Sequence, residues 1–273
     1  MGDDDRMRKP LIEWNSATLA RGAFSLLLGL SVYQLISQSG TFAKALMPEL
    51  PVIFSTFSIM SLDGSMFAHA GHTLLRVLLG WMLAILIAIP IGVLMARVKV
   101  VEQFFLPLIS VFMPIPSLAW VPIFILWFGL GDITTIIVVF YAASFPMALN
   151  TWTGVRSVSG LWIRAGQSLG ANTRQLFWAV IIPGSSPFII SGVRQSFQRA
   201  WIAVIGAEMI AASDWGLGWV IFDSKEFLST DVMLASVMVI GIIGFLFEKF
   251  VLSKIEQKTV VRWGMLKKQR ESQ

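Results

Sequence analysis

The chain has 273 residues, of which 56% are hydrophobic and 14% charged, and its mean hydropathy is +0.74. Soluble domains carry about a quarter charged residues, so this composition excludes an ordinary soluble domain and predicts an all-α integral membrane protein. In such a chain the net charge of +5 is a sign of membrane topology rather than of nucleic-acid binding, and the absence of cysteine excludes disulfides and thiolate metal sites.

The first apolar run, over residues 18–38, follows a short polar segment at residues 1–17. A secretory signal has an apolar core of about 7–15 residues and a small-residue cleavage site. This run is longer and has no such site, so we interpret it as a retained span. The next apolar pieces, over residues 46–64, are broken by Pro48, Pro51 and Asp63, which favours a short helix at the membrane interface over another span.

Further apolar windows long enough to cross a bilayer follow along the chain, since about 20 residues of helix are needed. They lie at residues 73–96, 104–128, 133–152, 186–211 and 232–252. The sequence thus predicts about six spans in a transmembrane domain over residues 18–252, followed by a basic tail at 253–273.

The distribution of basic residues orients these spans. With the N-terminus inside, the outer loops hold only Lys44 and Lys225, whereas most of the 21 lysines and arginines fall on the inner side. Positive-inside bias therefore predicts that both termini are cytoplasmic. The longest cytoplasmic loop then lies between spans four and five, at residues 153–184.

This loop is only half apolar and contains several helix-breaking residues. We expect Gly170 to adopt a positive φ, Asn172 or Thr173 to cap the following helix, and Pro183 to end it. Two short helices meeting at an angle are the predicted result. The mixture of bulky apolar and basic residues in RQLFWAVII fits either a docking surface or an amphipathic helix on the membrane.

The fifth span carries three charged residues, which is costly in a membrane. Arg199 lies near the predicted midplane, and Arg194 lies about a turn and a half nearer the cytoplasm, with Gln198 adding polarity. Such arginines either pair with neighbouring helices or face a pathway, where they would favour anions. Glu208 would lie about 21 Å from Arg194, so we expect it to meet another helix or the outer vestibule.

Prolines crowd the third span, including Pro114 and Pro116. Each removes a backbone donor, so the span should be kinked, either beside a pathway or merely in packing.

Two histidines, His69 and His72, form an H-x-x-H at the outer edge of the second span. Zinc sites need three or four ligands, and no acid or cysteine joins this pair, so we predict no metal site. Arg76 follows one turn later and is interpreted as a snorkelling or packing charge.

Several ordered motifs carry a resemblance to a known family. The segment RAGQSLGANTRQLFWAVIIP has the spacing of the signature E-A-A, three residues, Gly, nine residues, I-x-L-P, with Arg164 in place of the acid and Gly166 in place of the second alanine. The resemblance is extended by three further motifs, PIPSLAWVP, AWIAVIGAEM and GLGWVI. Over most of residues 45–255 the chain resembles permease subunits of bacterial ABC importers of the nitrate/sulfonate/taurine class.

The resemblance implies a MetI-like permease fold with a cytoplasmic coupling helix between spans four and five that docks on a separate ATPase. The coupling residues it implies are Arg164, Ala165, Gly166, Leu169, Gly170, Arg174, Leu176, Phe177 and Pro183. Leu169, Leu176 and Phe177 would supply an apolar knob, and Arg164 would need an acidic partner or free solvent. No G-x-x-x-x-G-K-[ST] phosphate loop is present, so the chain is expected to be no enzyme and to bind no cofactor, with ATP and Mg²⁺ held by the partner.

The resemblance also implies a bacterial inner-membrane assembly. The expected partners are a second permease copy, two ABC ATPase subunits and a solute-binding protein at loops 39–70 and 213–231, with no nucleic acid. The cargo would be a small anion such as a sulfonate, taurine or nitrate, and the pathway candidates are Arg194, Gln198, Arg199, Glu208, Pro114 and Pro116.

Two other classes of protein are weighed against this one. An ion-coupled secondary transporter would want acids in several spans, and this chain offers only Glu208, with Glu248 near the end of span six. A lipid-modifying membrane enzyme would need clustered groups for acid–base or metal chemistry, and the sequence offers few residues of these kinds.

Overall fold

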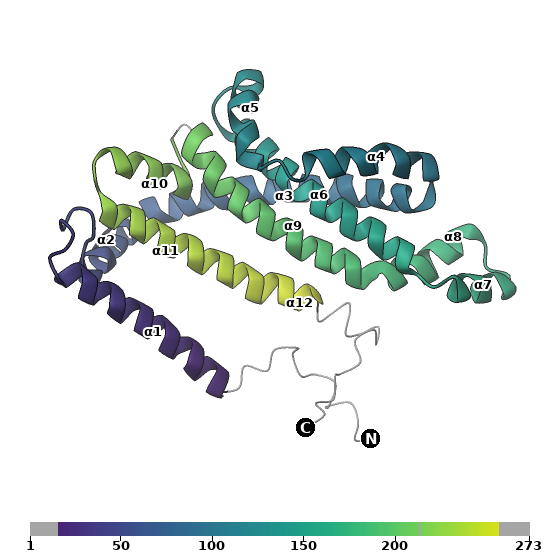
Figure 1. The fold of residues 1–273 in the computed structure, drawn as a ribbon, viewed down its shortest axis with the longest axis horizontal. Coiled ribbons are helices and arrows are strands. Elements are labelled where there is room, and N and C mark those ends of the chain that lie inside the picture. Colours follow the sequence, from purple (N-terminus) through teal and green to yellow (C-terminus); the bar gives the residue numbers. More distant parts are fainter. Residues whose placement is uncertain (1–15, 213, 257–273) are drawn as a thin grey trace.

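A computed structural model describes residues 16–212 and 214–256, and every regular element in that part of the chain is a helix (Figure 1). The long helices are α1 (Ser16–Gln38), α3 (Ser65–Arg97), α6 (Asp132–Ser157), α9 (Ile182–Ala211) and α11 (Thr230–Phe247). The shorter elements are α2 (Leu50–Leu62), α4 (Lys99–Phe112), the 3₁₀ helix η2 (Ser117–Trp120), α5 (Val121–Phe128), α7 (Gly160–Ser168), α8 (Thr173–Leu176), the π-helix η3 (Phe177–Ile181), α10 (Leu217–Glu226), the π-helix η4 (Glu248–Leu252) and α12 (Ser253–Glu256). The predicted polar segment and basic tail lie largely outside the described residues.

Five helices of the described chain are long and apolar enough to cross a membrane, and a sixth span results if the bent pair α4 and η2–α5 is counted as one. This agrees with the prediction of about six spans. The short helix expected near residue 50 is α2, which packs beside α11 and α3.

The core consists of α3, α6 and α9, in which α6 packs extensively against both α3 and α9. Glycines let these helices approach closely, as is usual in membrane bundles. A Cβ on Gly80 of α3 would lie 2.7 Å from the Val139 side chain of α6, and one on Gly192 of α9 would lie 2.8 Å from Asn150. This rigid trio positions the polar residues of α9.

Helix α1 runs apart from this core and joins the rest of the fold only near its C-terminal end (Figure 1). There the Tyr33 hydroxyl donates to the Pro48 carbonyl at 2.8 Å, and the Ser37 hydroxyl donates to the Met47 carbonyl at 2.9 Å. The remaining face of α1 is apolar and exposed, as expected for a helix surrounded by lipid.

The third predicted span, 104–128, is not one kinked helix. Helix α4 ends at Phe112, and the chain resumes as η2 and α5 at 90° to it. Pro114 and Pro116 lie in the break and have no N–H to offer. The Phe112 carbonyl at the break accepts one hydrogen bond of 3.1 Å from the Ile115 N–H and one of 2.8 Å from the Tyr141 hydroxyl of α6. The break is therefore held by a side chain of the core.

The prediction that Pro183 ends a helix is wrong. One helical path continues from Thr173 to Ala211, through η3 into α9. Pro183 lies at the first turn of α9, where a missing N–H is tolerated. Its ring would clash with the carbonyl of Ala179 in a regular α-helix, and the wider π turn of η3 occupies that position.

Candidate functional site

Two regions of the fold hold the residues singled out from the sequence, and the first is the loop between α6 and α9. Gly170 adopts φ +80° and separates α7 from α8. The Asn172 side chain accepts from the Gln175 N–H at 2.9 Å, and the Gln175 side chain accepts from the Asn172 N–H at 2.8 Å. This capping box confirms the predicted break at Gly170 and the predicted cap at Asn172.

The predicted apolar knob of this loop is only partly on its surface. Leu169 is 88% exposed, whereas Leu176 is buried and Phe177 is partly buried. Leu176 packs against α7 so closely that a Cβ on Gly166 would lie 2.6 Å from its Cδ2 atom. That contact gives a physical reason for glycine where the signature has alanine. Leu176 is thus a packing residue of the loop.

The exposed surface of the loop combines apolar and basic groups. Arg164, Ala165 and Arg174 are all exposed. The apolar side chains that accompany Leu169 on the surface are Leu161, Trp162 and Trp178.

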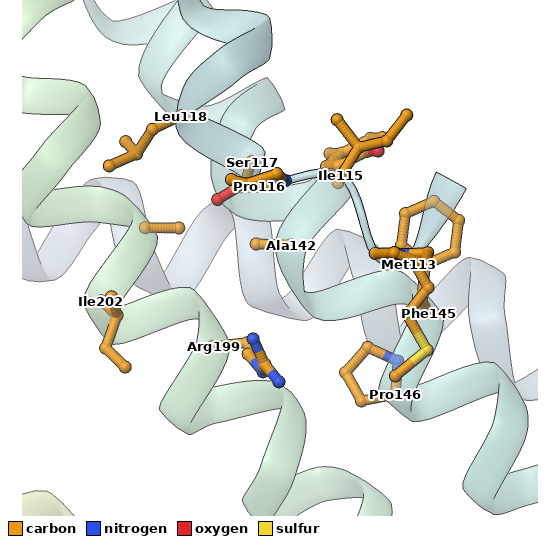
Figure 2. A pocket seen from close by; sticks show the side chains of 13 residues that line it. Met113, Ile115, Pro116, Ser117, Leu118, Ala142, Phe145, Pro146, Arg199 and Ile202 are labelled. Carbon is orange, nitrogen blue, oxygen red and sulfur yellow. The ribbon is translucent and has the colours of Figure 1, made fainter. Parts of the chain in front are cut away.

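The second region is a cavity of about 280 Å³ where the break after α4 faces α6 and α9 (Figure 2). It brings together three of the predicted pathway residues, Pro114, Pro116 and Arg199. In Figure 2 the Arg199 side chain extends from α9 below the broken segment. The full lining is Met113, Pro114, Ile115, Pro116, Ser117, Leu118, Tyr141, Ala142, Phe145, Pro146, Arg199, Ile202 and Ala203.

Polar side chains continue from this cavity along α9. Gln195, Gln198 and Arg199 are exposed, and the Asn150 amide of α6 donates to Gln195 at 3.2 Å. A run of exposed polar groups in the middle of an apolar helix is poorly suited to lipid contact. This face of α9 therefore requires water or another protein beside it.

Arg194, nearer the start of α9, does not line the cavity. Its Nε atom lies 2.8 Å from Oε1 of Glu248 on η4, and both side chains are about one-third exposed. This is the pairing with a neighbouring helix that the sequence left open as the alternative to a pathway position. A pathway role for Arg194 stays a prediction.

Glu208 lies at the other end of α9, in a buried charge cluster with Arg76 of α3. Its side chain is fully buried and accepts from Arg76 at 2.8 Å and from the Thr73 hydroxyl at 2.9 Å. Arg76 also donates to Asp132 at the start of α6 at 2.7 Å. Glu208 thus meets another helix, as expected. Of the two alternatives given for Arg76, a snorkelling or a packing charge, its burial and pairing agree with the packing charge.

The buried cluster also fixes the turn before α10. The N–H groups of Gly216, Leu217 and Gly218 donate to His69 Nδ1 at 3.2 Å, to Thr73 at 2.9 Å and to Glu208 at 3.0 Å. The His69 ring also contacts Trp215, with ring centroids 4.9 Å apart and the planes tilted by 38°. In the part of the chain that the structure describes, no three histidine, cysteine or acidic side chains converge as a metal site.

This arrangement is that of a transport subunit: a helical membrane bundle, a broken span beside a cavity, and an exposed capped loop at one end. The family model for "binding-protein-dependent transport system inner membrane component" matches residues 88–255. The chain belongs to this family of ABC transporter permeases, which are transport subunits rather than enzymes and work with separate ATPase subunits.

Several relatives within this family are named for the compound that they transport. The chain is 39% identical to the taurine transport system permease protein TauC of Escherichia coli K12 over 187 residues, 68% of each chain. It is 29% identical to the putative aliphatic sulfonates transport permease protein SsuC of Bacillus subtilis 168, over 86% of this chain and 84% of that one. It is also 30% identical to the bicarbonate transport system permease protein CmpB of Synechococcus elongatus, over 70% of this chain and 68% of that one.

The fold is similar to that of a solved transporter. A chain of the inward-facing MetNI methionine ABC transporter superposes with a TM-score of 0.56 at 16% identity, covering 74% of this chain and 97% of that one. The MetI-like fold expected from the resemblance is therefore confirmed.

Proposed function

We propose that this permease subunit forms the translocation pathway of an ATP-driven importer for a small anion, and that Arg199 faces the passing cargo. The observation that carries the proposal is the exposed Arg199 guanidinium at a cavity whose lining contains no acidic side chain. An unbalanced cation in a membrane pathway attracts anions. The relatives named for aliphatic sulfonates and bicarbonate support an anionic cargo here, and the relative named for taurine has a cargo with a sulfonate group.

The exposed polar face of α9 supports pairing with a second permease copy. Gln195, Gln198 and Arg199 cannot be accommodated by lipid at low cost. A homodimer that places this face along a shared, water-filled pathway would hydrate these groups from both sides. The pathway then lies between two copies of α9.

The loop at residues 153–184 supplies the contact with the ATPase in this proposal. Leu169 and the neighbouring basic groups would dock on a cytoplasmic ABC ATPase subunit, which holds the ATP and Mg²⁺. Both termini would lie on the same cytoplasmic side, in keeping with the basic residues there. A solute-binding protein would deliver cargo at the other end, to loops 39–70 and 213–231.

Two ion pairs argue against an ion-coupled secondary transporter. Glu208 is engaged by Arg76 and Glu248 by Arg194, so neither of the span acids named in the sequence is a free carboxylate. Coupling to protons would need an acid that can gain and lose a proton during transport. ATP-driven transport needs none.

The test is anion uptake into proteoliposomes that contain the permease, its ATPase subunits and its binding protein. We expect Arg199→Gln to lower ATP-dependent uptake about tenfold or more, because a hydrogen bond to a charged group is worth about 1.5–3 kcal/mol. Arg199→Lys should retain part of the rate. Arg21→Gln, which removes an exposed arginine from the separate helix α1, is the matched control and should leave uptake unchanged. Undiminished uptake by Arg199→Gln, or uptake without the ATPase, would contradict the proposal.

A further inference from the structure

We infer that the cavity beside Arg199 is a cargo subsite of the permease itself, and that it takes monovalent organic anions with a short hydrocarbon chain. The inference rests on the proposed function and narrows its cargo. It assigns to the membrane subunit a selectivity of its own, in addition to that of any binding protein.

The charge of the lining selects for net anions. Arg199 is the one charged residue among the 13 that line the cavity. A guanidinium binds two oxygens of a sulfonate or carboxylate at once. The lining offers no carboxylate to an ammonium group, so a zwitterion gains less here than an anion of the same size.

The walls select for a hydrocarbon chain. The lining includes the apolar residues Met113, Leu118, Phe145 and Ile202 (Figure 2). Burial of each methylene against such walls strengthens binding about fourfold. Pockets for drug-sized ligands enclose about 300–1,000 Å³, so an open cavity of about 280 Å³ has room for a sulfonate head group and several carbon atoms.

The supply of hydrogen-bond donors disfavours strongly hydrated inorganic anions. The Tyr141 hydroxyl already donates to the Phe112 carbonyl, and Ser117 carries the other hydroxyl of the lining. A bare oxyanion such as bicarbonate would lose hydration water on every side and regain few bonds. An alkanesulfonate can instead bind Arg199 through its sulfonate group while its hydrocarbon chain contacts the apolar walls.

The experiment uses the purified permease with its ATPase subunits in lipid nanodiscs, without the binding protein. Ligand-induced thermal stabilisation gives apparent Kd values for methane-, ethane-, propane- and butanesulfonate, for taurine and for bicarbonate. We expect Kd to fall about fourfold per methylene until the cavity is filled. Propanesulfonate should bind more tightly than taurine, in which an ammonium replaces the terminal methyl. Equal Kd values along the series, or tighter binding of taurine or bicarbonate, would overturn the inference.

Variants of Arg199 and Ile202 separate the contribution of the anionic head group to binding from that of the ligand's hydrocarbon chain. Arg199→Gln should weaken every sulfonate about tenfold or more, whereas Ile202→Ser should flatten the dependence on chain length and leave methanesulfonate unchanged. Ile210→Ser changes a similarly exposed residue of the same helix outside the cavity and should behave like the parent. An Arg199→Gln protein that binds like the parent rules out the subsite.

Different outcomes would contradict the anion pathway and the cargo subsite. If uptake depends on Arg199 but the purified complex shows no chain-length dependence, the anion pathway stands and the subsite is wrong. If uptake by Arg199→Gln is unchanged, the proposed function itself is wrong.

Discussion

The two ends of the helical core are built in opposite ways. At the end near α10, Arg76, Glu208, Thr73 and the turn at Gly216 form a buried network of ion pairs and hydrogen bonds. At the other end, the loop with α7 and α8 depends on a capping box and on the packing of Leu176, and most of its side chains are exposed (Figure 1).

This difference indicates which end is held by buried charges and which end is exposed. Buried, fully paired charges tolerate little displacement, because separating them leaves a charge without compensation. A loop with an exposed apolar residue and few internal contacts can move as a unit and can be covered by another protein. Substitutions of Glu208, Gly218 and Leu169 test this contrast, with a decreasing expected effect on folding.

The largest effect is expected from Glu208→Ala. It leaves the buried Arg76 guanidinium without its buried partner, which destabilises proteins by about 3–5 kcal/mol. Thermal or denaturant unfolding of the purified permease in detergent measures the change. Glu208→Gln keeps the size of the side chain and should lower the free energy of unfolding by a smaller amount. A Glu208→Ala protein that unfolds within about 1 kcal/mol of the parent would show that the network does not stabilise this end.

A smaller effect is expected from Gly218→Ala. A Cβ there would lie 2.4 Å from the Ile205 carbonyl oxygen and 2.8 Å from Glu208 Cβ. Because backbone cannot easily yield, we expect a loss of about 1–3 kcal/mol, as for other overpacked sites. Gly241→Ala is the control, since nothing lies within 4 Å of the added atom and alanine favours helix by up to about 1 kcal/mol. Equal stability of the two variants would argue against tight packing at Gly218.

The smallest effect on folding is expected from Leu169→Ser in the loop. Leu169 is 88% exposed, so the free energy of unfolding should change by no more than about 0.5 kcal/mol. Co-purification with the ATPase should nevertheless decrease. Leu62→Ser removes an equally exposed leucine, 89%, from α2, and should leave both properties unchanged. Loss of ATPase binding in both variants, or in neither, would contradict a docking role specific to the loop.

Local signals in the sequence were sufficient for the loop and for the number of spans. Gly170 and Asn172 act within a few residues of themselves, so their positive φ and capping box follow from local preferences. Apolar length alone predicts the long helices. The 90° break in the third span was underestimated as a kink, because proline content predicts lost hydrogen bonds but not how far the chain then turns.

Non-local contacts were the part that sequence reasoning missed. Arg76 and Glu208 are far apart in the chain, and only the fold brings them together. A signal was available, since His69, Thr73 and Arg76 recur at helical spacing on one face of an apolar helix. The burial of Leu176 was harder to predict, because the only sign of it in the sequence is Gly166, ten residues earlier, which leaves room for its side chain. Arg199 was recognised as a candidate, but its cavity depends on the break opposite it.

The unbroken helical path from Thr173 to Ala211 has a geometric consequence. Leu176 and Arg199 lie about 34 Å apart along it, at about 1.5 Å per residue. If the path swings as one rod by about 5°, Arg199 is displaced by about 3 Å, roughly the length of a hydrogen bond. A slight tilt of the rod at its α8 end would therefore be enough to make or break a hydrogen bond of Arg199, with no rearrangement of the rod itself.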